Sequence, residues 1–145
     1  PYGAVQGQKL GLLLESLFDG SPEDFDRLPI PFRAVATDIV DGSAVVPARG
    51  RLAEVVRASM AVPAVFAPME IDGRLLVDGG LVNNVPISVV RGMGATRVIA
   101  VDVGSPLFRR EQLRSPADVA FQMVSVILKE RTDRELATLA EGDVL

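Results

Sequence analysis

Residues 69–80 read MEIDGRLLVDGG, and this stretch predicts a β-hairpin. Two short segments rich in apolar residues, 69–71 and 74–77, flank an Asp-Gly dipeptide. Asp-Gly is favoured in tight hairpin turns because both residue types tolerate the positive φ that such turns require. The second predicted strand leads directly into Asp78, which two glycines follow. The hairpin therefore places a carboxylate at the end of a strand.

The segments before and after the hairpin predict helices and strands in an order that is typical of α/β folds. Apolar residues recur three or four positions apart, as on one face of a helix, in three segments. A fourth helix is predicted from its start, where Ser115 suits the N-cap, Pro116 the first helical position and Asp118 the capping box. These predicted helices are residues 8–18, 51–60, 86–93 and 115–139. Residues 32–39 and 44–46 flank a second Asp-Gly dipeptide and predict another hairpin. Residues 97–103 form a nearly continuous aliphatic run, which predicts a strand buried on both faces of a parallel sheet.

The composition excludes several kinds of chemistry. The 145 residues, 48% hydrophobic and 23% charged, suit one globular domain. The sequence contains no cysteine and no histidine, so a thiolate site and the imidazole of a Ser-His-Asp triad are both excluded. Acid–base chemistry therefore falls to carboxylates. The sequence has neither a phosphate-binding loop nor a calcium-loop motif, so we expect no cofactor and no metal. The net charge of −4 opposes nucleic-acid binding, and we expect no nucleic-acid partner.

The ends of the sequence predict a piece of a longer protein. The first residue is proline, and the last four residues, 142–145, stop where a strand would begin. We find no signal peptide, because the start has neither a basic region nor an apolar one. The apolar stretches 61–69 and 98–101 are far shorter than the roughly 18 residues of a membrane-spanning helix.

Asp78 is the strongest candidate for chemistry. A carboxylate at the end of a stiff strand is held in place, and two following glycines offer no side chain to block a substrate. The same residues are also typical of an ordinary turn in which Asn84 caps the next helix, and spacing alone favours that turn. Asp102, at the end of the aliphatic run, is expected to be structural. On these residues alone, both interpretations of Asp78 stay open.

Four blocks of sequence, in this order, resemble the carboxyl-terminal half of a bacterial patatin-like phospholipase. They are PFRAVATDIVDGSAVV at 31–46, RASMAVPAVFAP at 57–68, LLVDGGLVNNVPI at 75–87 and GATRVIAVDVG at 94–104. The last stretch, QMVSVILKERTDRELATLAEGDVL at 122–145, resembles the subgroup in which a patatin domain precedes a POTRA module and an outer-membrane barrel.

The resemblance implies an α/β fold of three layers, a sheet sandwiched by helices. Residues 1–145 would be the carboxyl-terminal part of one such domain. It also implies a serine acyl hydrolase with a Ser-Asp dyad, in which Asp78 polarises the serine of an upstream G-x-S-x-G elbow. The sequence contains no G-x-S-x-G, so the nucleophile and the oxyanion hole are expected in a preceding half. We expect these 145 residues alone to be inactive.

Other residues are expected to support this site. Gly79 and Gly80 would form a wall without side chains beside Asp78. Ser59, in the RASMAVP sequence, and Asn84 are expected to support the site rather than to attack the substrate. Three apolar residues are either pocket lining or plain core, with core favoured: Met60, Val62 and Phe66.

We therefore expect a lipid acyl-ester hydrolase of the phospholipase A or lysophospholipase type, with a phospholipid or related lipid ester as substrate and a membrane surface as its place of action. Two alternatives stay open. A non-catalytic α/β domain that binds lipid or a partner would share the scaffold, and nucleotide or small-ligand binding rests on fold analogy alone. The subgroup resemblance implies the outer membrane or secretion, whereas other bacterial relatives are cytoplasmic. The sequence leaves the oligomeric state open.

Overall fold

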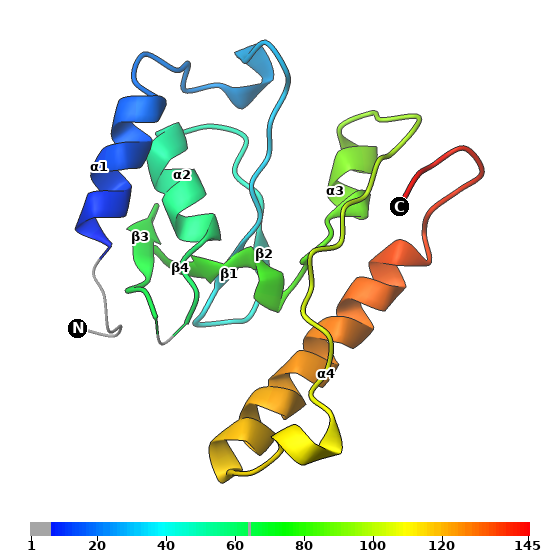
Figure 1. Cartoon of the computed structure of the whole chain (residues 1–145). Coiled ribbons are helices and arrows are strands. Elements are labelled where there is room, and N and C mark those ends of the chain that lie inside the picture. The colour runs from blue at the N-terminus through cyan, green and yellow to red at the C-terminus, as the bar shows by residue number, and fades with distance from the viewer. Residues whose placement is uncertain (1–6, 64) are drawn as a thin grey trace. The chain divides into compact units, whose positions relative to one another are not determined.

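The computed structural model describes residues 7–63 and 65–145 (Figure 1). The chain divides into two compact units at the peptide bond between Val82 and Asn83. In the described ranges, no helix combines the length and apolar character that crossing a membrane requires.

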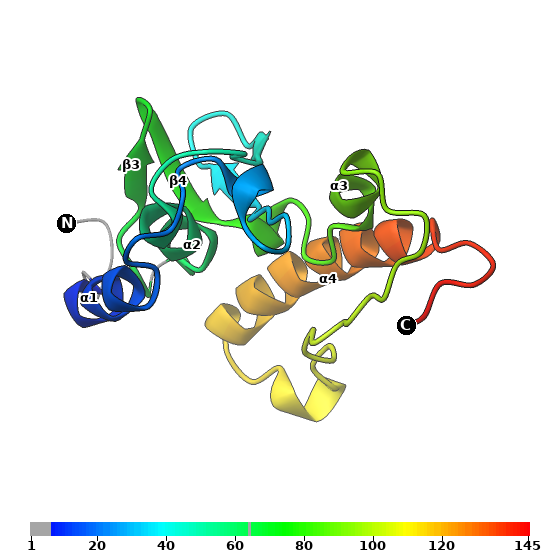
Figure 2. The same cartoon turned by 90° about the horizontal axis from the view of Figure 1, so that it is seen from above.

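The first unit contains a small antiparallel sheet and two helices. Its elements are α1 (Gln8–Leu17), η1 (Phe25–Arg27), β1 (Ala36–Asp38), β2 (Ala44–Val45), α2 (Leu52–Ser59), β3 (Met69–Ile71), β4 (Arg74–Asp78) and η2 (Gly79–Leu81). The strand order is β2-β1-β4-β3, and each neighbouring pair is antiparallel. Helix α2 packs against the sheet and α1 packs against α2 (Figures 1 and 2). Both predicted hairpins and both predicted helices of this unit are confirmed, and so is the α/β class.

The turn between β3 and β4 has the backbone conformation that its Asp-Gly sequence predicts. Asp72 has φ 51° and Gly73 has φ 73°. Positive φ at both central residues is the geometry whose twist matches that of paired strands. The turn therefore fixes the register in which Met69 lies opposite Leu76, and with it the position of Asp78 at the far end of β4.

One face of α2 packs into the core of the first unit. Leu52 and Val55 pack with Phe25 and Ala34, while Ala58, one turn further on, packs with residues of the sheet. Each fully buried aliphatic side chain contributes about 1.5–3 kcal/mol to folding. The spacing of three residues puts these side chains on one helix face, which explains why the sequence pattern predicts this helix correctly.

The second unit contains two helices and an extended segment. Its elements are α3 (Ile87–Gly92), η3 (Arg110–Gln112) and α4 (Pro116–Leu136). The predicted capping box at the start of α4 is present, because Ser115 Oγ accepts the N–H of Asp118 at 3.1 Å and Asp118 Oδ2 accepts the N–H of Ser115 at 2.8 Å. Buried Val98 and Ile87 belong to the core of this unit.

The prediction of a doubly buried strand at residues 97–103 is wrong. The segment is extended without forming a regular strand, and Ile99 and Val103 are 79% and 84% exposed. It forms one parallel bridge, in which the N–H of Ala100 donates to Val144 O at 2.8 Å and the N–H of Val144 donates to Val98 O at 2.9 Å. A strand buried on both faces needs covering layers on both sides. Among the described residues, only the face with Val98 and Ala100 is covered.

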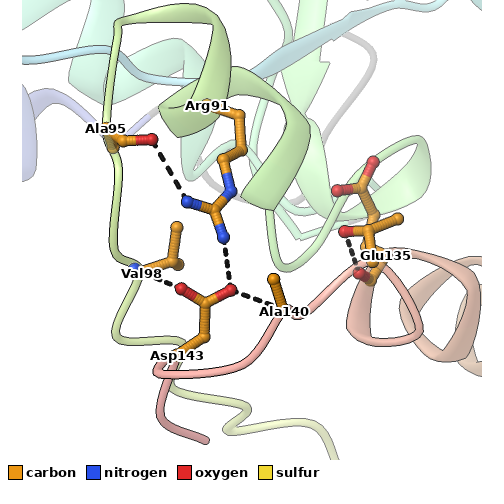
Figure 3. A network of polar contacts seen from close by, with 7 residues as sticks. Arg91, Ala95, Val98, Glu135, Ala140 and Asp143 are labelled. Carbon is orange, nitrogen blue, oxygen red and sulfur yellow. Dashed lines mark hydrogen bonds and ion pairs between the residues drawn. The ribbon is translucent and has the colours of Figure 1, made fainter.

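A buried carboxylate joins the end of the chain to α3 (Figure 3). Asp143 accepts the N–H of Val98 at 2.8 Å and the N–H of Ala140 at 2.7 Å, and its Oδ2 pairs with the guanidinium of Arg91. Arg91 in turn donates to Ala95 O at 3.2 Å. The side chain of Asp143 is only 2% exposed. The N–H groups of Ala140 and Val98, followed by Arg91, hold the pKa of Asp143 below its ordinary value of 3.8.

We expect Asp143→Asn to lower the melting temperature at pH 7. The asparagine NH2 would face an N–H donor in place of an acceptor oxygen, so at least one buried hydrogen bond is lost. Because the folded-state pKa is depressed, the carboxylate contributes its stability above pH 3.8 and loses it as the pH falls through the lower folded pKa. The difference from wild type should therefore shrink in acid. Thermal unfolding of wild type and Asp143→Asn at pH 7 and pH 3 measures this difference in melting temperature.

The matched control is Asp133→Asn, which removes an exposed carboxylate from an ion pair with Lys129 on the surface of α4. Exposed pairs of this kind contribute little to stability. If Asp143→Asn were as stable at pH 7 as this control, the hydrogen bonds and the ion pair of Asp143 would not contribute to holding residues 140–143 against α3 and Val98.

Candidate functional site

Asp78 is the last residue of β4, and its backbone and side chain are both anchored. Its N–H donates to Ala61 O at 3.0 Å, and its Oδ1 accepts the N–H of Gly80 at 2.7 Å. The side chain is half-buried. Among the residues described, Oδ2 of Asp78 carries no hydrogen bond. One carboxylate oxygen is thus held by the backbone, while the other is available to accept a proton.

Gly79 is required by the packing of the backbone. It is buried, and a Cβ placed on it would lie 2.0 Å from Val35 O and 2.5 Å from the carbonyl carbon of Val35. Real Cβ atoms do not approach other atoms this closely, so only glycine permits this contact between η2 and the chain just before β1. Gly79 thus has a packing role that the sequence alone does not reveal.

Two hydroxyl groups donate hydrogen bonds to backbone carbonyls at Asp78 and beside Gly79. Ser59, at the end of α2, donates its hydroxyl hydrogen to Val35 O at 2.7 Å. Thr37, on β1, donates its hydroxyl hydrogen to Asp78 O at 2.8 Å. Ser59 therefore bonds the carbonyl against which Gly79 lies. Sequence reasoning missed Thr37, because a threonine in a strand is ordinary and its partner lies 41 residues away.

Asn84 belongs to the second unit and its side chain is exposed. The alternative in which Asn84 caps the following helix is wrong, because Glu135 on α4 performs that function. Glu135 Oε2 accepts the N–H of Ser88 at 2.9 Å, and Oε1 accepts the hydroxyl hydrogen of Ser88 at 2.7 Å. The side-chain amide of Asn83 also donates to Glu135, at 3.1 Å.

The three apolar candidates have different surroundings. Met60 and Val62 are exposed, so the core interpretation is wrong for both. Phe66 is partly buried and lies under the guanidinium of Arg57, whose central carbon is 4.9 Å from the ring centre. Arg57 itself is buried, and this burial lowers the pKa of its guanidinium. One face of the Phe66 ring is therefore covered by a cation–π contact with Arg57.

Two other carboxylates, those of Asp38 and Asp102, have structural partners. Asp38 accepts the N–H of Val40 at 3.0 Å, and Asp102 accepts the N–H of Gly104 at 2.8 Å, as in local turns. The part of the chain that the structure describes contains no group of three or more acidic side chains placed to hold a metal ion. Asp38 also ends a strand, but its Oδ2 lies 3.7 Å from the guanidinium of Arg74. Asp102 resembles Asp78 in that only its Oδ1 is bonded within the described chain, but its side chain is exposed. Of these three residues, Asp78 alone combines a strand end, a half-buried side chain and, among the residues described, an Oδ2 without a hydrogen bond.

This arrangement suits proton transfer. A carboxylate whose orientation is fixed through one oxygen can accept a hydroxyl proton at the other if that hydroxyl comes within about 2.6–3.2 Å. The structure brings together Asp78, Gly79 and Gly80, and it links Ser59 to them through Val35. The hydroxyl of Ser59 is already bonded to a backbone carbonyl, which suits support of the site and not nucleophilic attack.

Comparison with known proteins gives a consistent result. Residues 7–91 match the family model described as patatin-like phospholipase. An uncharacterised NTE family protein of Mycobacterium tuberculosis is 46% identical over 82 residues, which are 57% of this chain and 23% of that protein. Patatin-like phospholipase domain-containing protein 7 of Rattus norvegicus is 46% identical over 82 residues, 55% of this chain and 6% of that protein.

Patatin-like phospholipase domain-containing protein 6 of Homo sapiens is 42% identical over 85 residues, 57% of this chain and 6% of that protein. The chain thus spans less than a quarter of the length of these curated relatives. The family match covers more than half of the chain and includes Ser59 and the whole of the Asp-Gly-Gly sequence. The chain belongs to the patatin-like phospholipase family.

Proposed function

We propose that the full-length protein hydrolyses acyl esters of phospholipids or similar lipids through a Ser-Asp dyad in which Asp78 is the base. The observation that carries this proposal is the anchoring of Asp78 by the N–H of Gly80, which leaves Oδ2 without a hydrogen bond in the described chain. Membership of the patatin-like phospholipase family supports a lipid ester as substrate. The serine nucleophile is proposed to come from a G-x-S-x-G segment outside these 145 residues.

In this mechanism Asp78 acts twice. Oδ2 first accepts the hydroxyl proton of the serine as the serine oxygen attacks the ester carbonyl, and the proton then passes to the departing alcohol. Water next attacks the acyl-serine and gives a proton to the same carboxylate, which passes it to the serine oxygen as the bond between that oxygen and the acyl carbon breaks and the fatty acid leaves. Proton transfer of this kind typically contributes 10²–10⁴-fold to the rate. A carboxylate that is already oriented does not have to be ordered at the moment of reaction.

Four further residues are proposed to support this site. Gly80 orients the carboxylate, Gly79 lets the chain after Asp78 lie against Val35, and Ser59 bonds that same Val35 carbonyl. Asn84 is included on the family match alone, which covers residues 7–91. No metal or cofactor takes part in the proposed reaction.

We also propose that residues 1–145 are the carboxyl-terminal part of a larger patatin domain that acts at a membrane surface. Exposed apolar side chains support this, because soluble domains rarely leave large apolar areas uncovered. On α4 they include Phe121, Met123 and Ile127, which are 58%, 64% and 53% exposed. A POTRA module and outer-membrane barrel in the same polypeptide, and hence an outer-membrane or secreted location, remain part of this proposal.

The test is covalent labelling of the intact gene product with a fluorophosphonate, followed by mass spectrometry to locate the modified residue. We expect one serine outside these 145 residues to react, and to react much more slowly in Asp78→Asn. The matched control is Asp102→Asn, because Asp102 is exposed and bonds only its local turn within the described chain. A wild-type protein that is not labelled would support the non-catalytic alternative.

A further inference from the structure

The backbone N–H and the backbone carbonyl of Asp78 both form hydrogen bonds that are not part of the backbone pairing between β1 and β4. In the register of β1 and β4, Ala36 lies opposite Asp78 and Thr37 lies opposite Val77. The N–H of Asp78 donates to Ala61 O, and its carbonyl oxygen accepts the hydroxyl hydrogen of Thr37 at 2.8 Å. Thr37 is itself only 3% exposed. A side chain of the neighbouring strand thus satisfies the carbonyl of the candidate base.

The carbonyl of Asp78 defines the plane of the peptide bond between Asp78 and Gly79. That plane directs the chain so that Gly79 lies against Val35 and the N–H of Gly80 points back to Asp78 Oδ1. If the carbonyl rotated, the N–H of Gly80 would move away from the carboxylate. The hydroxyl of Thr37 is therefore linked to the carboxylate through two consecutive peptide units.

Position 37 requires a side chain that donates a hydrogen bond, and not only one that suits a buried strand. Valine has nearly the same shape as threonine and favours strands equally, but it cannot donate a hydrogen bond. A part-buried carbonyl that loses its hydrogen-bond partner is disfavoured, so a valine here would favour a different orientation of the Asp78 carbonyl. The hydroxyl, and not the bulk of the side chain, is the group that holds this orientation.

We propose that Thr37 is a positioning residue for the candidate base: its hydroxyl fixes the Asp78–Gly79 peptide, so that Gly80 can hold the carboxylate. This inference rests on the proposed function of Asp78. Ser59 reinforces the same arrangement from the other side, since its hydroxyl bonds the Val35 carbonyl against which Gly79 lies. Thr37 acts through Asp78 and does not itself touch the substrate.

The test compares Thr37→Val and Thr37→Ser in the full-length protein, with a short-chain p-nitrophenyl ester as substrate. We expect Thr37→Val to lower kcat about tenfold with KM nearly unchanged, because a misplaced catalytic group slows the chemical step more than it weakens binding. Thr37→Ser keeps the hydroxyl and should restore most of kcat. Thr132→Val is the matched control, because Thr132 is also buried and lies on α4 in the other unit.

A double-mutant comparison separates positioning from a general loss of stability. If Thr37 acts only through Asp78, Thr37→Val should lower kcat no further in a protein that already carries Asp78→Asn. Full kcat in Thr37→Val, or failure of Thr37→Ser to restore it, would overturn the inference. If Thr37→Val does not fold, Thr37→Ala removes the same hydroxyl with a smaller side chain, and the same kcat ratio is expected.

A second readout does not depend on activity. Hydrogen exchange of the Gly80 amide should be faster in Thr37→Val than in wild type and Thr132→Val, because the Gly80 N–H would lose its place at Asp78 Oδ1. Unchanged exchange at Gly80 would contradict the positioning role even if the wild-type protein proved inactive on esters. An inactive wild type with faster exchange in the variant would count against the proposed function and not against the geometry inferred for Thr37.

Discussion

Asp78→Asn should reduce kcat/KM for ester hydrolysis by about 10³-fold while the protein stays folded. Asparagine keeps an oxygen that can accept the N–H of Gly80, so the local backbone arrangement is preserved. Its amide nitrogen, however, is a hydrogen-bond donor whose lone pair is delocalised into the carbonyl, so it does not take the serine proton and the base is lost. Steady-state hydrolysis of a short-chain p-nitrophenyl ester by the full-length protein, with the melting temperature measured alongside, tests this expectation.

The matched substitution is Asp102→Asn, which removes a carboxylate that is exposed and bonded to the N–H of Gly104. It should leave kcat/KM at the wild-type value. If Asp78→Asn and Asp102→Asn had the same activity as wild type, Asp78 would be a turn residue, as its spacing alone also allows, and the dyad would have to be abandoned.

Gly79→Ala should destabilise the protein by about 3 kcal/mol, at the upper end of the range for substitutions that overpack a site and shift the backbone. The added Cβ would lie 2.0 Å from Val35 O, and both the carbonyl and the segment after Asp78 are main chain, so neither can move aside as a flexible side chain does. Ester hydrolysis should fall as well, because the displaced segment carries the Gly80 N–H away from Asp78. Chemical denaturation and kcat/KM of the full-length protein measure the two effects.

Gly11→Ala provides the control for adding a methyl group. Gly11 lies inside α1, and a Cβ placed on it meets no atom within 4 Å. Alanine is favoured over glycine in a helix by about 1 kcal/mol, so this variant should be as stable as wild type or slightly more stable. A Gly79→Ala protein with equal stability would show that the close approach to Val35 relaxes without cost.

Much of the local structure could be predicted from the sequence because its causes are local. Asp72-Gly73 specifies a turn with two positive φ values, and Ser115 with Asp118 specifies the start of α4. Apolar spacing predicts α1 and α2 to within one residue at each end. These features depend on residues within one turn or one hairpin, where backbone preferences act without help from distant parts of the chain.

The segment 97–103 could not be predicted in the same way. An aliphatic run shows that a segment is suited to burial, but not which neighbours cover it. In the described chain, Ile99 is 79% exposed and the segment pairs at a single bridge. Likewise, the sequence allowed Asn84 as a helix cap as one of two open interpretations, whereas Glu135, 47 residues after Ser88, provides the cap.

For the candidate site, the residue pattern predicts Asp78 at a strand end, followed by two glycines that leave the chain free to turn. How that carboxylate is held depends on contacts made in the folded chain. Thr37 meets Asp78 across 41 residues, Ser59 meets Val35 across 24, and Gly79 lies against a carbonyl that no pattern near it predicts. Local spacing encodes turns and helix faces, whereas contacts between distant hydroxyls and carbonyls depend on how strands and helices pack, and this becomes visible only in the folded chain.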